Sequence, residues 1–206
     1  NLLAGVIYPP NAMAPAPLAT EAKVPFVIMN AGTAVITTRS PYIVRTSFTL
    51  WQSSFPLGTW AAKKYKTAYT LVSDFGPGHD AETAFTQAFK AGGGNVVANV
   101  RVPLQNPDWA AYMQRVKDAK PDAVFNTLNG DSNVAFFKQF KAAGLTAQGM
   151  PVMSVSVAEE EIRGIGAENI APTTKPITTI IHTWSTMPKS TSGRHPIPQV
   201  RFMIVR

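Results

Sequence analysis

The sequence predicts an open α/β fold in which parallel strands alternate with helices. Short apolar runs with little polar alternation recur along the chain, as in strands that are covered on both faces. Between these runs lie stretches in which apolar residues recur at helical spacing. Strand, helix and parallel strand in succession form a sheet with right-handed crossovers. We therefore expect parallel sheets flanked by helices.

The strand candidates are the apolar runs at residues 2–8, 25–29, 68–73, 96–101, 123–126 and 151–155. Helices are predicted over residues 81–91, 109–120 and 131–143, where apolar side chains share one face. Asp80 and Asp131 precede or begin two of these helices and are suited to be N-caps. Gly144 and the three glycines after Ala91 are suited to end helices.

Composition narrows the function classes. The net charge of +7 arises mostly from residues 172–206, which hold five basic residues and no acid, whereas residues 1–171 hold 14 basic and 12 acidic residues. With a net charge of only +2, residues 1–171 lack the basic surface that nucleic-acid binding requires. The chain has no cysteine, which excludes disulfides and thiolate metal sites. No apolar run approaches the roughly 20 residues of a membrane span, and the apolar start is interpreted as a buried strand.

In open α/β sheets, ligands bind beyond the carboxyl ends of the strands. This rule selects the loops at residues 8–13, 30–38, 74–80, 127–133 and 154–161, where small polar residues gather. Residues 171–206 differ from the rest of the chain, since they are rich in proline and threonine and show no clear periodicity. We expect this tail to be poorly ordered or foreign to the fold.

Three segments carry a resemblance: VPFVIMNAGTAVIT…PYIVRTSFT, YTLVSDFGPGHDAETAFTQAFKAGGGNVV and PDWAAYMQRVKDAKPDAVFNTLNGDSNVAFFKQFKAAGL. In this order they resemble class I periplasmic solute-binding proteins of ABC transporters, of the Leu/Ile/Val-binding type. The stretch SVSVAEEEIRGIGAENI is similar to the urea and short-chain-amide receptors of that superfamily. The resemblance covers residues 2–170. It implies part of lobe one over residues 1–49, lobe two over 50–170 and a divergent tail over 171–206, so that the fold is incomplete at both ends.

The resemblance implies a periplasmic receptor, and not an enzyme, that captures a small polar solute by hinge closure and delivers it to ABC permease subunits. The solute would be an amino acid, an amide or urea, or a small organic acid, and no cofactor or metal is implied. The alternatives are a sensor or regulator on the same fold, a small hydrolase that uses His79, and a non-functional fragment from a truncated or frame-shifted gene. Because one lobe is incomplete, we expect the 206-residue chain to bind its ligand poorly.

On the family pattern, the ligand carboxylate is held by the loop that contains Ala31 and Thr33, through backbone N–H groups and a hydroxyl. Gly32 between them is equally consistent with a plain turn. The family places a serine in the preceding loop, where this chain has Pro9-Pro10-Asn11. Proline has no N–H to donate. Asn11 is either a substitute for the serine as a hydrogen-bond donor or a residue of a simple turn.

In lobe two, amino-acid receptors hold the ligand ammonium with an acid, at a place that falls near Ser156 here. Serine cannot neutralise a cation, which disfavours an α-amino acid. Glu159 is a candidate ligand-binding residue. The simpler interpretation is that it belongs to an acidic first turn of a helix. Phe75 or His79 is expected to cover the ligand, and Asn129 to present a polar side chain to it. The sequence contains no nucleophile elbow, phosphate-binding loop or dinucleotide fingerprint.

Overall fold

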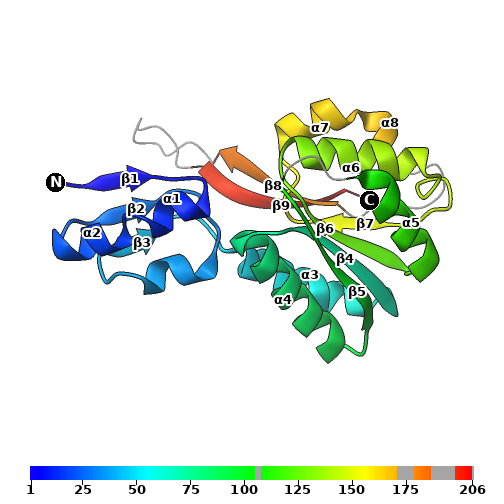
Figure 1. Cartoon of the computed structure of the whole chain (residues 1–206), viewed down its shortest axis with the longest axis horizontal. Helices are drawn as coiled ribbons and strands as arrows, with labels where there is room; N and C mark the ends of the chain where they lie inside the picture. The colour runs from blue at the N-terminus through cyan, green and yellow to red at the C-terminus, as the bar shows by residue number, and fades with distance from the viewer. Residues whose placement is uncertain (105–107, 171–178, 187–197, 206) are drawn as a thin grey trace. The chain divides into compact units, whose positions relative to one another are not determined.

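The computed structural model describes residues 1–104, 108–170, 179–186 and 198–205 (Figure 1). It has parallel sheets flanked by helices, which confirms the expected fold class. The chain divides into two compact units. The first comprises Asn1–Lys64 and Ser73–Gly94, and the second comprises Tyr65–Val72 and Asn95–Arg206.

The first unit contains a parallel sheet of three short strands, in the order β1 (Leu3–Gly5), β2 (Phe26–Ile28) and β3 (Ile43–Arg45). The connections hold α1 (Pro9–Met13), α2 (Ala16–Glu21) and the 3-10 helix η1 (Ala34–Thr38). Small side chains of the helices pack on the sheet, because alanine allows close approach. The buried cluster consists of Ala12, Ala16, Ala19, Phe26, Ile28, Ala31, Ile36 and Ile43.

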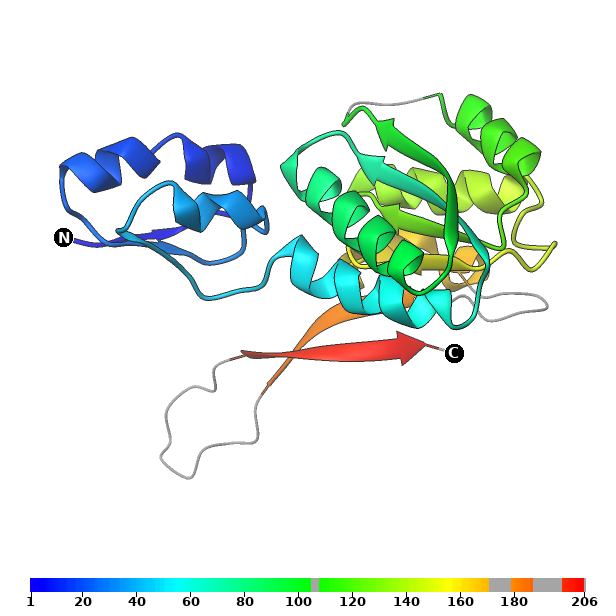
Figure 2. The ribbon, with the colours of Figure 1, turned by 90° about the horizontal axis from the view of Figure 1, so that it is seen from below.

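The same unit contains α3 (Leu50–Ala62) and α4 (Gly76–Ala91), which lie side by side (Figure 2). Helix α3 begins with a capping box, in which Gln52 N–H donates to Thr49 Oγ1 and Thr49 N–H donates to Gln52 Oε1. A Cβ atom at Gly58 would lie 2.6 Å from the carbonyl oxygen of Phe85. Glycine at this position therefore sets how closely the two helices approach.

The second unit contains a four-stranded sheet in the order β5 (Asn95–Val102), β4 (Thr67–Ser73), β6 (Ala123–Thr127) and β7 (Val152–Ser154). Strands β4, β6 and β7 run parallel. The helices of this unit are α5 (Trp109–Ala119), α6 (Asp131–Ala142), α7 (Glu159–Ile165) and α8 (Ala167–Ile170).

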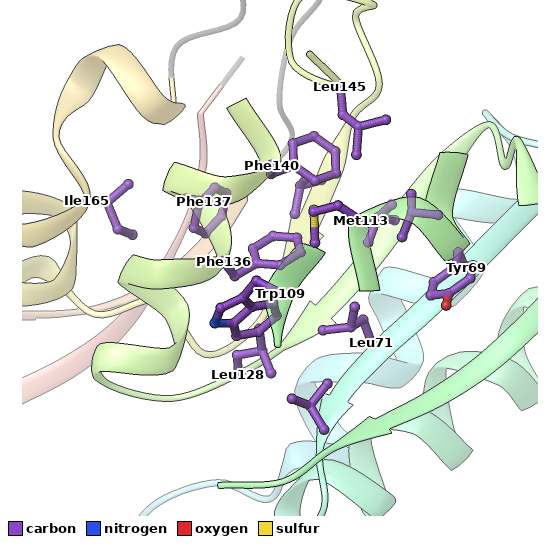
Figure 3. Close-up of a cluster of buried hydrophobic side chains, with 14 of the residues drawn as sticks. Tyr69, Leu71, Trp109, Met113, Leu128, Phe136, Phe137, Phe140, Leu145 and Ile165 are labelled. Carbon is purple, nitrogen blue, oxygen red and sulfur yellow. The ribbon is translucent and has the colours of Figure 1, made fainter. Parts of the chain in front are cut away.

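The core of this unit lies where α5 and α6 cover the sheet (Figure 3). Its aromatic members Trp109, Phe136, Phe137 and Phe140 make edge-on and tilted ring contacts, which pack rings more favourably than face-to-face stacking. Strand β4 is buried along its length, whereas β5 alternates between exposed and covered residues. Because successive side chains of a strand point to opposite faces, this alternation indicates that one face of β5 is better covered than the other.

Several local predictions were wrong. Helix α4 begins at Gly76 with Phe75 as N-cap, so Asp80 lies inside the helix and is not its cap. Helix α6 begins at Asp131 with Gly130 as N-cap. The expected loop at residues 8–13 is largely the helix α1, because proline is favoured in a first helical turn.

The elements that were not predicted include α2, β3, α3, η1 and α8. The expectation for residues 171–206 falls largely outside the described residues. Within that range the structure has β8 (Thr179–Thr186) and β9 (Pro198–Val205), which pair in antiparallel fashion.

Candidate functional site

Three segments that follow strands converge in the first unit. The N–H groups of Asn30 and Ala31 both donate to the carbonyl oxygen of Val6, at 3.2 and 3.1 Å. This fixes the segment after β2 against the segment after β1. The ring of Tyr8 stacks on the ring of Phe75 with centroids 5.8 Å apart and planes 23° apart. The segments after β1, after β2 and before α4 therefore meet at one place.

Thr33 lies at the centre of this region. Its side chain is only 7% exposed, and its Oγ1 is a buried atom without a hydrogen-bond partner among the described residues. A Cβ atom at Gly76 would lie 2.8 Å from Thr33 Oγ1, so the first residue of α4 approaches this hydroxyl closely. The first N–H groups of a helix have no partner within the helix. The N-cap residue Phe75 supplies none from its side chain.

The hydroxyl and the helix end together form a site suited to a small anion. The N-terminus of a 16-residue helix carries a partial positive charge. A hydroxyl adds a donor that rotates to suit its partner. Backbone and hydroxyl donors bind a carboxylate without a mobile counter-charge. The N–H of Ala31 already donates to the carbonyl oxygen of Val6, whereas Thr33 Oγ1 has no hydrogen-bond partner among the described residues.

The peptide between Thr33 and Ala34 has two charged neighbours. Arg45 donates from Nη2 to the carbonyl oxygen of Thr33. The N–H of Ala34 donates to Oδ2 of Asp80 at 2.7 Å. Burial lowers the pKa of the Arg45 guanidinium, and the negative charge of Asp80 opposes this shift.

The side chain of His79 contacts Asp74 and not its sequence neighbour Asp80, so these adjacent residues do not form an acid–base pair. Its Nε2 lies 2.7 Å from Oδ1 of Asp74, and the two side chains are 39% and 52% exposed. His79 lies in the first turns of α4, the helix that begins after Phe75. Phe75 directly precedes Gly76, which approaches Thr33, and His79 lies three residues further along α4.

Ser156 and Asn129 belong to the second unit, at the carboxyl ends of β7 and β6. Ser156 Oγ donates to the carbonyl oxygen of Leu128 at 2.5 Å, which joins the two loops. Asn129 is exposed beside this contact. The structure therefore places Ser156 and Asn129 in one loop cluster, and places Ala31, Thr33, Phe75 and His79 in the first unit.

A polar network that runs from the surface to the buried Asn133 supports the Ser156 loop. One oxygen of Glu161 accepts the N–H of Gly130 at 2.5 Å, and the other accepts from Ala158 N–H at 2.9 Å and Asn133 Nδ2 at 3.2 Å. Asn133 is fully buried and accepts in turn from Asn126 Nδ2 at 3.2 Å. The carboxylate of Glu161 is thus engaged by three donors within the protein.

Two candidate residues from the sequence, Asn11 and Glu159, remain to be placed. Asn11 is an exposed residue of α1, and its N–H donates to the carbonyl oxygen of Tyr8 at 3.0 Å. Glu159 is the first residue of α7, and its side chain lies outside the described part of the chain. Among the described residues, no group of three or more metal-ligating side chains is placed to hold an ion, and no helix has the length and hydropathy to span a membrane.

Sequence reasoning gave Asp80 only the role of an N-cap, and it did not single out Tyr8, Arg45 or Glu161. The signal for Glu161 was present, since a glutamate at the third helical position often reaches back to the N-cap N–H, as here to Ala158. Arg45 stands in the segment PYIVRTSFT without any local cue to its partner. The partners of Tyr8 and Asp80 lie far away in sequence and leave no local pattern.

Comparison with known proteins gives one consistent result. The sequence model of the periplasmic binding protein family matches residues 1–189. The Leu/Ile/Val-binding protein homolog 6 of Brucella melitensis is 44% identical over 154 residues, which make up 74% of this chain and 40% of that protein. The chain therefore spans less than half the length of this curated relative.

Two solved structures of solute-binding proteins of ABC transporters are similar to the chain. The protein from Rhodopseudomonas palustris BisB5, in complex with 3,4-dihydroxybenzoic acid, is 52% identical with a TM-score of 0.70, over 74% of this chain and 42% of that one. A second R. palustris protein, in complex with 4-hydroxybenzoate, is 46% identical with a TM-score of 0.77, over 82% of this chain and 47% of that one.

Proposed function

Because the chain belongs to the periplasmic binding protein family, we propose that it captures a small aromatic carboxylate of the hydroxybenzoate type for an ABC importer. The family consists of solute-binding receptors and is not an enzyme family, and its name places it in the periplasm. Since the chain spans less than half of the relatives above, transport, the permease partner and capture by hinge closure all belong to the proposal.

The observation that carries the proposal is the unpartnered hydroxyl of Thr33 beside the first residue of α4. A buried hydroxyl without a partner is costly, at about 1–3 kcal/mol. A ligand oxygen that accepts from Thr33 removes this cost and meets the positive end of the helix. A carboxylate is the small group that satisfies both donors.

The stacked rings of Tyr8 and Phe75 favour an aromatic ligand. Tyr8 is 42% exposed even though it is stacked, so part of this residue is accessible to a ligand. Aromatic rings gain about 0.5–1.5 kcal/mol from such contacts beyond the area that they bury. Phe75 precedes Gly76 directly, so a ring at the pair and a carboxylate at Thr33 fit one small molecule.

An α-amino acid fits less well. Its ammonium group needs a carboxylate with spare hydrogen-bonding capacity. In the first unit, the carboxylate of Asp80 already accepts from the N–H of Ala34, and that of Asp74 contacts Nε2 of His79 at 2.7 Å. These contacts favour a ligand with a carboxylate and without a cation.

The test is a ¹⁵N NMR titration of the chain, a method that also detects weak binding. 4-Hydroxybenzoate should shift the amide signals of Thr33, Ala34 and Gly76. Acetate, which lacks the ring, and 4-hydroxybenzyl alcohol, which lacks the carboxylate, should each bind about tenfold more weakly or worse. Leucine should bind more weakly than 4-hydroxybenzoate.

The matched variant is Thr33→Val, which removes the hydroxyl and keeps the shape. It should weaken 4-hydroxybenzoate about tenfold, the value of one lost hydrogen bond. Thr38→Val is the control, because Thr38 is exposed and its hydroxyl only donates to Val35 O at 2.8 Å. Unchanged affinity in Thr33→Val, or stronger shifts with leucine than with 4-hydroxybenzoate, would refute the proposal.

A further inference from the structure

We propose that Arg45 and Asp80 are positioning residues that clamp the peptide group between Thr33 and Ala34 from its two ends. Arg45 donates to the carbonyl oxygen of this peptide, and Asp80 accepts from its N–H at 2.7 Å. The consequence for ligand binding rests on the proposed function, but the clamp itself does not.

The two contacts act on one rigid object, because the atoms of a peptide group lie in a plane. A single hydrogen bond leaves the plane free to turn about that bond. Two bonds at opposite ends remove this freedom. The clamp therefore fixes the backbone of Thr33, which is extended with φ −69° and ψ 127°, and with it the direction of the Cα–Cβ bond that carries the hydroxyl.

Both contacts are charge-assisted, which makes them stronger than bonds between neutral groups. The guanidinium donates at the negative end of the peptide dipole, and the carboxylate accepts at the positive end. Both charges therefore polarise the peptide in the same sense. Three separate elements meet here, since Arg45 ends β3, Asp80 lies in α4 and Thr33 precedes η1.

The charges also depend on each other. Arg45 is partly buried, and its Nε is a buried atom without a hydrogen-bond partner among the described residues. Burial lowers the pKa of Arg45 and the charge of Asp80 raises it by less, so the carboxylate offsets part of the lost hydration of the cation. Both charged side chains bond to the peptide group between Thr33 and Ala34. The neutral donors of Thr33 therefore remain for the ligand.

The first readout is hydrogen exchange of the Ala34 amide in the 206-residue chain, measured by NMR without ligand. Asp80→Ala should speed this exchange about tenfold or more, because the acceptor is lost. Asp80→Asn keeps an acceptor without charge and should have a smaller effect. Asp118→Asn and Asp118→Ala are matched controls, since Asp118 is an exposed acceptor for Gln114 on α5.

The second readout is the affinity for 4-hydroxybenzoate. Asp80→Ala and Arg45→Met should each weaken binding about tenfold, and the double variant should lose less than the product of the two, because both act on one peptide. Arg45→Lys, which still donates to Thr33 O, should recover most of the loss. A purely structural role would instead lower the melting temperature without this rescue.

The outcomes separate the two proposals. If the wild-type chain shows no shifts with 4-hydroxybenzoate while Ala34 exchange responds to Asp80, the proposed function fails and the clamp stands. If Asp80→Ala and Asp80→Asn both leave Ala34 exchange unchanged, the clamp is refuted. Should Asp80→Ala not fold, Asp80→Asn carries the test, because it keeps size and an acceptor.

Discussion

Gly78 offers a sharp test of how the start of α4 is built. It lies in the first turn of the helix, where a Cβ atom would be placed 1.9 Å from the carbonyl oxygen of Ser73. Carbon and oxygen atoms in proteins normally approach to about 3.3 Å. The variant Gly78→Ala must therefore move the helix start or the end of β4 by more than an ångström. The backbone cannot rotate away as a flexible side chain would.

The cost follows from two opposing terms. Forcing a methyl group into a packed site costs about 1–3 kcal/mol, and here the upper part of that range applies because the clash is with backbone. Alanine gains at most about 1 kcal/mol over glycine in a helix. The expected net loss is about 2 kcal/mol, which corresponds to about 4–8 °C in melting temperature for a chain of this size.

The assay is urea unfolding followed by circular dichroism, with 4-hydroxybenzoate binding as a second measurement. Binding should also weaken, because the same turn carries Gly76 beside Thr33. Gly164→Ala in α7 is the control, since its Cβ would meet only a Val134 methyl group at 3.2 Å. A Gly78→Ala variant as stable as Gly164→Ala would refute the reasoning about the helix start.

Two further outcomes are expected. Glu161→Gln should lower the free energy of unfolding in urea by about 2–3 kcal/mol. The reason is that an amide nitrogen replaces one of the two oxygens that accept from Gly130, Ala158 and Asn133. A change below about 0.5 kcal/mol would contradict the network. Burial opposes ionisation of Asp122, but hydrogen bonds from the segment at Thr67 outweigh it and hold its pKa below the usual value. This contribution, about 1 kcal/mol or less for a solvent-screened group, should persist above the unfolded pKa near 4 and disappear as the pH falls through the folded pKa. The stability difference between wild type and Asp122→Ala, measured from pH 7 to pH 2, should shrink only in acid, and a difference independent of pH would refute the assignment.

The strands and longer helices of the second unit were predictable because their signals are local. The expected helices at 109–120 and 131–143 are α5 and α6 within a residue at each end. Their apolar faces form the core of Figure 3. Strand β3 was missed because its apolar run is cut short by Arg45 and only Ile43 of its three residues is buried.

The helix start at Gly76 was missed for another physical reason. Glycine and proline have low helix propensity, so GPGH is typical of a loop in isolation. In the folded chain the close approaches to Ser73 and Thr33 leave no room for side chains at these positions. Tertiary packing therefore outweighs local propensity at the helix start, which is part of the candidate site.

The sequence by itself determined the fold class, the family and the strand-end loops in which Thr33, Phe75 and Ser156 lie. These follow from apolar periodicity and from the order of segments, which are properties of neighbours along the chain. Only the tertiary structure decided which groups are already satisfied. Asp80 meets Ala34 across 46 residues and Glu161 meets Gly130 across 31, and each pairing decides which donors and charges remain for a ligand. A hydrogen bond depends on ångström distances between distant segments, and no local pattern encodes those distances.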